Sequence, residues 1–453
     1  MKIRSHEETI VLEEAVRILA EGFATLPNAE ETFDFEAIGK VLAETAARLQ
    51  DNYPYQHPLY AGQMLKPPHP VARLAYSLAM LINPNNHALD GGRASSAMEK
   101  EAVAQLGAMF GWGNALGHLC GGGTMANLEG LWVAGKSRPG TTIVASELAH
   151  YTHARISDVL ALKFESVRAD AAGGMDLAKL EKRLNAGGVG TVVATLGSTG
   201  GGTLDQLDRI IDLQRQYDFR IHVDAAYAGY FGLCSEIDAR SRDIFDAIEG
   251  ADSLVIDPHK HGLQPYGCGC ILFRDPAAGK YYKHDSPYTY FSSAELHLGE
   301  ISLECSRPGA SAVALWATQR LLPMTRDGEF ARSLDACLRA ARSFWTWLGS
   351  SPEFVPLMKP ALDIVLYVPV ARTSSAASQR ARRIFEQAAA DDLHLALAKM
   401  PRHLVEPYYP ELEFDTDSVT CLRSCLMKPA HEEWLGEICR RLEKAALSAE
   451  PVA

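Results

Sequence analysis

A series of short apolar runs, separated by helix-length segments, dominates the chain between about residues 70 and 320. The runs are rich in β-branched residues and nearly free of charge, which is typical of strands buried on both faces of a sheet. They occupy residues 141–146, 191–196, 220–225, 253–257 and 269–273. Between the second and third runs, an amphipathic segment places one set of apolar residues inward: Leu204, Leu207, Ile210, Ile211 and Leu213. This order predicts βαβ units, and therefore an α/β fold with a mostly parallel sheet and helices on both faces.

The flanking regions predict two further parts of the chain. The first fifty residues show the periodicity of two amphipathic helices. The Pro-rich stretch that follows cannot be a helix or a central strand, so we expect it to wrap over a surface or across a partner subunit. From about residue 330, helical segments and two apolar runs predict a smaller α+β domain. We therefore divide the chain into an N-terminal segment (1–65), a large domain (66–328) and a C-terminal domain (329–453).

Composition excludes several classes of protein. Apolar residues make up 47% and charged residues 22% of the 453, as in globular proteins. A net charge of −12 argues against a nucleic-acid-binding surface. The nine scattered cysteines include no CxxC pair, so we expect neither a disulfide framework nor a metal site. Without a signal-peptide core or an apolar run of 18 residues, the expectation is a cytoplasmic protein that binds no membrane.

A glycine-rich segment, HLCGGGTMANLEG at 118–130, precedes a helix-like run. Glycines let a ligand approach the backbone, and the start of a helix offers free N–H groups and positive potential. Gly123 and Thr124 are therefore candidates for holding a phosphate. The segment is not a P-loop, because GxxxxGK[ST] does not occur. The alternative is a flexible turn before a helix.

Two ionisable residues follow apolar strands, where parallel sheets place their ligands. Asp224 ends the run at 220–225, and a carboxylate there needs a cation or hydrogen-bond donors, unless it caps the next helix. Lys260 follows the run at 253–257 and stands between His259 and His261. A desolvated lysine beside other cationic groups can form a Schiff base, although most lysines are surface charges.

A phosphate cradle, a carboxylate and a lysine, in this order, are what pyridoxal phosphate requires. Its phosphate would bind at the helix start, its aldehyde would condense with Lys260, and Asp224 would keep its ring nitrogen protonated. The residues therefore predict pyridoxal 5'-phosphate as the cofactor.

The sequence resembles the group II pyridoxal-phosphate-dependent amino-acid decarboxylases, which include glutamate, aromatic-L-amino-acid and tyrosine decarboxylases. The segments that carry the resemblance are HPLYAGQM (57–64), AHYTHAR (149–155), VVATLGST (192–199), HVDAAYAG (222–229) and IDPHK (256–260). It covers residues 50 to 320 well and the remainder loosely. It implies the fold-type-I architecture of pyridoxal-phosphate-dependent enzymes, and a carboxy-lyase that converts an amino acid to an amine and carbon dioxide.

The resemblance also implies roles for single residues. Lys260 corresponds to the Schiff-base lysine, and Asp224 to the partner of the pyridine nitrogen. His150 corresponds to the histidine that stacks on the ring, with His153 as a competitor. Other positions match cofactor contacts or the substrate-side segment: Gly123, Thr124 and His259 at the phosphate, Thr199 and Ala226 at the ring, and Tyr60 and Gln63 toward the substrate. Asp257 stands where relatives carry Asn or Asp.

Departures from the family pattern leave some roles open. Many members have Trp after the lysine, where this chain has His261, and the segment that follows is closer to the archaeal tyrosine/aspartate decarboxylases. The segment SRPGA (306–310) is similar to sphingosine-phosphate lyases. The mobile catalytic loop of the aromatic decarboxylases is shorter here, and Tyr288 and Tyr290 are the candidates for returning a proton to Cα. Packing at a subunit boundary is the alternative for both tyrosines.

Arg423 and Arg307 are candidate carboxylate ligands, with structural ion pairs as the alternative. An arginine on the departing carboxylate would oppose decarboxylation, so a distal acidic group of the substrate is the better partner. A carbon–carbon lyase, an aminotransferase and a non-catalytic relative remain alternative functions. Because the family is usually dimeric, the resemblance implies a homodimer with the active site at the interface.

Overall fold

The central sheet of the computed structural model has seven strands in the order β1-β7-β6-β5-β4-β2-β3. The structure describes residues 5–27, 32–87, 91–283 and 302–449. The strands are β1 (Leu116–Cys120), β2 (Thr142–Ser146), β3 (Lys163–Val167), β4 (Val189–Thr195), β5 (Arg220–Asp224), β6 (Ser253–Ile256) and β7 (Gly269–Phe273). Only β7 runs against its neighbours, so the prediction of a mostly parallel sheet is confirmed.

All five predicted strands are present, and β1 and β3 are additional. The sequence LGHLC of β1 contains a histidine that is buried in an ion pair with Glu129. The strand β3, KFESV, lies at the sheet edge with most of its residues exposed or half-exposed. Neither strand therefore shows the continuous apolar run of a strand that is covered on both faces.

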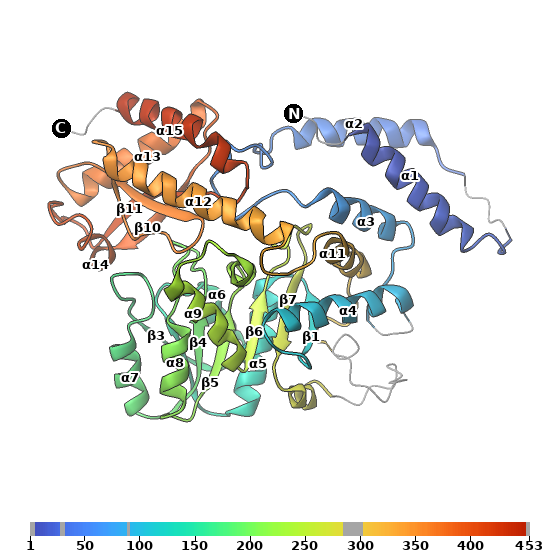
Figure 1. Ribbon diagram of the computed structural model, residues 1–453, viewed down its shortest axis with the longest axis horizontal. Helices are drawn as coiled ribbons and strands as arrows, with labels where there is room; N and C mark the ends of the chain where they lie inside the picture. Colours follow the sequence, from blue (N-terminus) through green and yellow to red (C-terminus); the bar gives the residue numbers. More distant parts are fainter. Residues whose placement is uncertain (1–4, 28–31, 88–90, 284–301, 450–453) are drawn as a thin grey trace.

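Helices cover both faces of the sheet, because successive side chains of a strand point in opposite directions. In β4, Val192 and Ala194 pack with α7, α8 and α9, whereas Val193 packs with α5. Figure 1 shows α7, α8 and α9 in front of the strands. The helices of this part are α3 (Pro70–Met80), α4 (Arg93–Met109), α5 (Gly123–Ser137), α6 (Thr152–Val159), α7 (Leu177–Asn185), α8 (Leu207–Gln214), α9 (Ala239–Asp246) and α11 (Gly309–Leu321), with 3-10 turns η1 (Gly229–Leu233), η2 (Ala247–Gly250) and η3 (Pro276–Tyr281).

A second, antiparallel sheet follows in the chain, in the order β10-β11-β9-β8. Its elements are α12 (Glu329–Ser350), β8 (Phe354–Pro356), β9 (Ile364–Pro369), α13 (Ser374–Ala390), β10 (Ala396–Pro401), α14 (Arg402–Val405), β11 (Ser418–Cys425) and α15 (His431–Ser448). Helix α12 starts at Glu329, and the division of the chain at residues 328 and 329 stays a prediction. The apolar runs of the sequence are β9 and β11, as expected.

The Pro-rich stretch packs partly into the interior of the small sheet's layer. Leu59 and Ala61 belong to the apolar cluster of that layer. The amide N–H of Ala61 bonds to the carbonyl of His394, and the carbonyl of Ala61 accepts from Cys425. The segment therefore connects the N-terminal region to the small sheet by hydrogen bonds and buried apolar contacts. The sequence predicted a wrap over a surface and did not predict these buried contacts.

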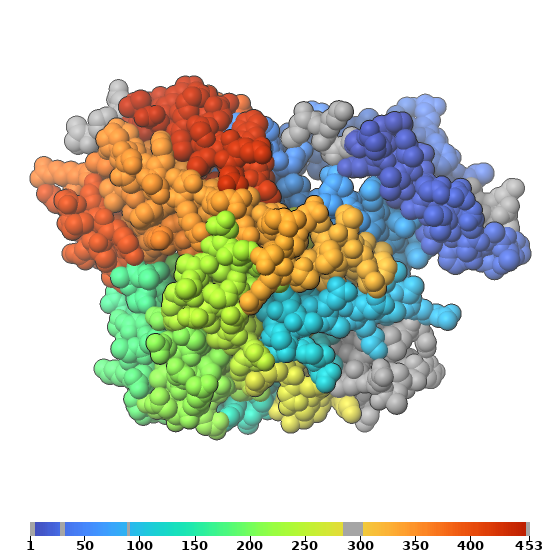
Figure 2. Space-filling view, viewed as in Figure 1, coloured from blue at the N-terminus to red at the C-terminus, as the bar shows by residue number. Residues whose placement is uncertain are grey.

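The first two helices, α1 (His6–Glu21) and α2 (Phe35–Leu49), project from the body as an arm (Figures 1 and 2). Neither helix contains a buried residue. An ion pair between Glu8 and Arg73 links α1 to α3 at 2.8 Å. Among the described residues, no helix is both long and apolar enough to cross a membrane.

Candidate active site

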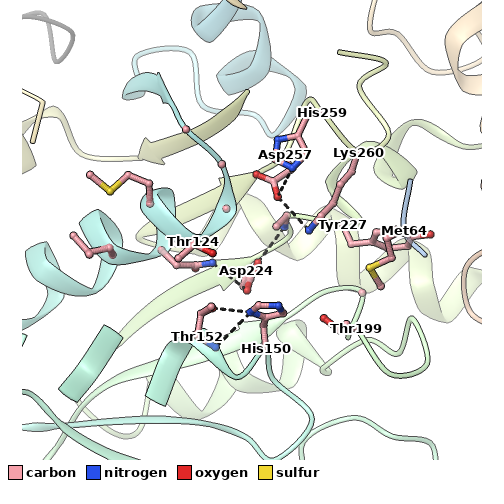
Figure 3. A pocket seen from close by; sticks show the side chains of 18 of the residues that line it. Met64, Thr124, His150, Thr152, Thr199, Asp224, Tyr227, Asp257, His259 and Lys260 are labelled. Atoms are coloured by element: carbon pink, nitrogen blue, oxygen red, sulfur yellow. Dashed lines mark hydrogen bonds and ion pairs between the residues drawn. The ribbon is translucent and has the colours of Figure 1, made fainter. Parts of the chain in front are cut away.

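A cavity of about 530 Å³ lies at the carboxyl edge of the large sheet. The loops after β1, β2, β4, β5 and β6 all contribute to it, as expected for ligand sites in parallel sheets. Eight residues expected at the cofactor line it together: Gly123, Thr124, His150, Thr199, Asp224, Ala226, His259 and Lys260. Figure 3 labels Thr124, His150, Thr199, Asp224, His259 and Lys260 among them.

Lys260 enters the cavity from the loop after β6 (Figure 3). Its Nζ lies 3.1 Å from Oδ2 of Asp257, and Asp257 directly follows the strand. Asp257 is buried, whereas the side chain of Lys260 retains 22% of its exposure. The loop therefore presents a primary amine that a ligand in the cavity can reach.

Asp224 is the last residue of β5 and is buried at the bottom of the cavity. Its Oδ2 accepts hydrogen bonds from His153 Nε2 at 2.8 Å and from Asn127 Nδ2 at 3.2 Å. Its Oδ1 accepts the backbone N–H of Ala226 at 3.1 Å. Burial raises the pKa of this carboxyl, but the hydrogen bond and charge of His153, with Lys260, outweigh burial and hold the pKa well below its usual range. Asp224 is therefore an anion in the cavity.

His150 follows β2 and points into the cavity from the side of α6 (Figure 3). Its Nδ1 lies 2.7 Å from the hydroxyl of Thr152, which fixes the orientation of the ring. Burial lowers the pKa of His150, so the neutral imidazole is favoured near pH 7. A neutral flat ring at this position can lie against another flat ring.

The glycine-rich segment forms the turn between β1 and α5, and α5 starts at Gly123. No side chain in the described part of the chain forms a capping hydrogen bond at this helix start. Gly122 has φ +144°, and a Cβ on Gly123 would lie 2.7 Å from Asp257 Oδ2. His259 lies beside the turn, with its Nδ1 2.9 Å from the carbonyl of Cys268. The turn thus brings backbone N–H groups to the cavity, where they can bind an anion.

The residues expected to face the substrate line a second cavity of about 320 Å³. Tyr60, Gln63 and Arg423 lie there rather than in the cavity of Lys260. Arg423 links the two cavities, because its Nη1 donates to the carbonyl of Thr199 at 2.6 Å. Its Nε is buried and has no partner among the described residues.

Two other sets of candidates have different outcomes. Arg307 is buried in an ion pair with Glu99, at 2.6 Å, and also donates to the carbonyls of Asn86 and Leu119. It does not line the cavity, so the ion-pair alternative describes it. Tyr288 and Tyr290 lie outside the described residues.

His261, the residue after Lys260, belongs to a buried polar cluster. Its Nδ1 lies 3.3 Å from Nζ of Lys66, and its Nε2 lies 3.3 Å from Oδ2 of Asp363. The hydroxyl of Tyr227 donates to the other oxygen of Asp363 at 2.7 Å. Because Tyr227 also lines the cavity, this cluster supports its wall.

Sequence reasoning missed His153 and Asn127 as partners of Asp224. In the sequence, the second histidine of AHYTH competes with His150 for the ring position, and nothing local points from it to Asp224. Asn127 lies in the first two turns of α5, where an Asn in a helix carries little information by itself. Glu304 was also missed, and its carboxylate accepts the N–H of Gly121 at 3.2 Å.

The cavity fits pyridoxal 5'-phosphate by the chemistry of its donors. An uncapped helix start can take the phosphate, and an anionic carboxylate with three donors retains room for one more. The amine of Lys260 can react with an aldehyde. Within the described ranges, no group of three or more His, Cys, Asp or Glu side chains is placed to hold a metal ion.

A model of the pyridoxal-dependent decarboxylase conserved domain matches residues 138–367. An L-tyrosine decarboxylase of Enterococcus faecium is 28% identical, over 73% of this chain and 72% of that protein. An L-aspartate decarboxylase of Thermococcus kodakarensis is 27% identical, over 72% of this chain and 84% of the relative.

Solved structures with the same fold include mouse CSAD and a TDC of Oryza sativa crystallised with PLP and tryptamine. The first has a TM-score of 0.77 at 21% identity and covers 96% of this chain and 91% of its own. The second has a TM-score of 0.78 at 18% identity and covers 99% of both chains.

Proposed function

This chain belongs to the pyridoxal-dependent decarboxylase family, and on that premise we propose which of its residues hold the cofactor and act on the substrate. The protein is a carboxy-lyase that uses pyridoxal 5'-phosphate to convert an amino acid to an amine and carbon dioxide. Its two relatives described above are decarboxylases, which favours this reaction over carbon–carbon lysis or transamination.

Lys260 would carry the cofactor, and Asp224 would face the nitrogen of its ring. Gly123, Thr124 and His259 hold the phosphate at the start of α5. His150, Ala226 and Thr199, which line the same cavity, would contact the ring. The observation that carries this proposal is that Lys260 and Asp224, from two neighbouring strands, line one cavity together with an uncapped helix start.

When bound, the cofactor accepts the electron pair that a substrate bond to Cα leaves behind. The chain's own residues then decide which bond that is, because they orient the substrate. Asp224 supplies a fixed negative charge that keeps the ring nitrogen protonated. After carbon dioxide leaves, a proton must be returned to Cα, and Tyr288 or Tyr290 is the proposed donor. The primary amine of Lys260 would be the group to which the cofactor is attached before substrate binds and after product leaves.

The substrate's side chain extends from the cavity of Lys260 toward the second cavity. Arg423 lines the second cavity and donates to the carbonyl of Thr199, which lines the first, and its guanidinium binds an acidic group at the far end of that side chain. Tyr60 and Gln63 line the remaining wall. The aspartate decarboxylase among the relatives agrees with an acidic substrate, whereas the tyrosine decarboxylase would place a phenol there.

We propose further that the protein is a homodimer with its active site at the subunit interface. The arm formed by α1 and α2 exposes a row of apolar side chains that a second subunit would bury: Ile10, Val11, Ile18, Phe35, Ile38, Val41, Leu42 and Leu49. Exposed apolar area of this extent on two adjacent helices is typical of an interface.

The test is to locate the covalent attachment. The holoenzyme is reduced with borohydride, and the modified peptide is identified by mass spectrometry. We expect the cofactor's mass on Lys260, no label in K260A, and a normal label in K280A, which removes a lysine distant from the cavity. A label on another lysine of the wild type would reject the proposal.

The substrate class is tested by measuring carbon dioxide release from a panel of amino acids with wild type and R423Q. We expect R423Q to lose activity on acidic substrates only.

A further inference from the structure

We propose that His153 is a positioning residue that holds the carboxylate of Asp224 against the cofactor's ring nitrogen. This inference rests on the proposed function, because it assumes that Asp224 faces that nitrogen. His153 is fully buried in the first turn of α6, and its Nε2 lies 2.8 Å from Oδ2 of Asp224. Because the acceptor is a carboxylate, the nitrogen that faces it carries the proton.

Among the described residues, the imidazole of His153 has no other polar partner. Its Nδ1 is buried without a hydrogen bond. Burying a polar ring with one unpaired nitrogen costs folding free energy. We infer that the hydrogen bond made by the other nitrogen is the reason for a histidine at this position. That contact is Asp224, and the side chain therefore acts on the site through this carboxylate.

The donors around Asp224 leave one direction open. A carboxylate has about four acceptor positions. His153, Asn127 and the N–H of Ala226 take three of them; Asn127 and Ala226 line the cavity, whereas His153 lies behind its lining. The remaining position can receive an N–H from a ligand in the cavity. Since His153 and Asn127 both bind Oδ2, they fix the rotation of the carboxylate.

A second chain of hydrogen bonds fixes Asn127 itself. His222 Nε2 lies 2.9 Å from Oδ1 of Asn127, and His222 Nδ1 lies 2.8 Å from the hydroxyl of Ser253. Burial lowers the pKa of His222 to about 3, so this imidazole is neutral. Its Nε2–H then binds Oδ1, which turns the Nδ2 group of Asn127 toward Asp224. The side chain of His153 bonds only to Asp224 among the described residues, whereas that of Asn127 also bonds to His222. Removing the His153 side chain should therefore break a hydrogen bond of Asp224 and no other.

The test compares the binding of two ligands to the apoenzyme. One is pyridoxal 5'-phosphate, and the other is its 1-deaza analogue, in which a carbon replaces the ring nitrogen. If Asp224 binds that nitrogen, the wild type should prefer the true cofactor by about 10- to 100-fold, the range of a hydrogen bond to a charged group. In H153L the preference should fall to within about threefold, because the carboxylate loses its positioning donor.

Two variants separate positioning from packing. H153Q keeps a side-chain N–H that can reach Asp224, so it should retain most of the preference. S157A removes a buried hydroxyl without a partner from the same helix and should retain all of it. Circular dichroism establishes that each variant is folded, and H153M, with an unbranched apolar side chain, replaces H153L if the latter does not fold.

The possible results are distinct. A wild type that binds both ligands equally would overturn the placement of Asp224 at the ring nitrogen, and with it the proposed cofactor contacts. A wild type with the preference, together with an apolar variant that keeps it, would overturn the role of His153 alone. Equal loss of the preference in H153Q and H153L would also count against positioning through a hydrogen bond.

Discussion

The amine of Lys260 and the carboxylate of Asp257 form an ion pair, with 3.1 Å between Nζ and Oδ2. Asp257 is 2% exposed, and its Oδ1 has no hydrogen-bond partner among the described residues. A buried carboxylate in this situation depends on its cation. The lysine proposed to bind the cofactor therefore also compensates a charge in the cofactor-free protein.

Removal of this cation should destabilise the apoenzyme. We expect K260M to lower the free energy of unfolding by about 1–3 kcal/mol, because Asp257 then remains buried without a charged partner. The double variant K260M/D257N should recover most of that loss. Urea unfolding of the cofactor-free proteins measures both effects, and equal stability of the single and double variants would contradict the prediction.

Gly123 should be sensitive to the smallest enlargement. A Cβ there would lie 2.7 Å from Asp257 Oδ2 and 3.2 Å from Cβ of Ala226, so the start of α5 must shift. G123A should weaken pyridoxal 5'-phosphate at least about tenfold by disturbing the N–H groups proposed to hold its phosphate. Pyridoxal, which lacks the phosphate, should bind G123A and wild type alike.

A matched control is available in α15. A Cβ on Gly436 meets nothing within 4 Å, so G436A should leave cofactor affinity unchanged and raise stability by up to about 1 kcal/mol. Absorbance titration measures the affinity for the cofactor. Equal affinity in G123A and G436A would contradict the assignment of the phosphate site.

Asp363 should be indispensable for stability because it is the carboxylate of the buried cluster that holds Lys66 and His261. D363N removes the anion that His261 and Tyr227 contact, beside the buried amine of Lys66, and we expect a loss of about 3–5 kcal/mol in unfolding free energy. K66M/D363N removes the amine of Lys66 as well and should be more stable than D363N. Chemical denaturation of the three proteins decides the point, and a double variant weaker than D363N would disprove the coupling.

Lys428 should make stability depend on pH in the alkaline range. Its Nζ is buried and donates to the carbonyl of Tyr60 at 2.6 Å, and burial lowers its pKa to about 7. In the unfolded chain this amine titrates near its ordinary value of about 10.4. Between these values the unfolded state binds more protons, so this residue makes stability rise with pH by at most about 1.4 kcal/mol per pH unit.

The variant K428M should lack that contribution. Urea unfolding of both proteins at pH 7, 8 and 9 measures this contribution. We expect the free energy of unfolding of the wild type, minus that of K428M, to increase as pH rises. Parallel curves for the two proteins would show that Lys428 does not titrate in this window.

The apolar face of the arm should control assembly. Val41 and Leu42 in α2 are 62% and 61% exposed, and replacing both with lysine should shift the proposed dimer to monomer. The neighbouring K40A, which alters only a surface ion pair with Glu36, should not. Light scattering coupled to size-exclusion chromatography measures the mass, and a dimeric V41K/L42K would reject the arm as the interface.

Local patterns in the sequence were sufficient for much of the fold and part of the site. Apolar, mostly β-branched runs identified β2, β4, β5, β6 and β7, because a strand covered on both faces is predominantly apolar. Asp224 and Lys260 could be recognised because each follows such a strand, and parallel strands bring their carboxyl ends to one edge. The glycines before α5 could be recognised as a candidate phosphate site because they directly precede a helix-like run in the sequence.

The tertiary structure alone decided the contacts that connect distant segments. His153 meets Asp224, Lys66 meets His261, and Arg423 meets the carbonyl of Thr199 across separations of 71, 195 and 224 residues. No periodicity records such pairs, because each depends on how elements that are far apart in the chain pack against one another. Strand and helix periods follow from the geometry of neighbouring residues, whereas the partner of a buried polar group is set by the path of the whole chain.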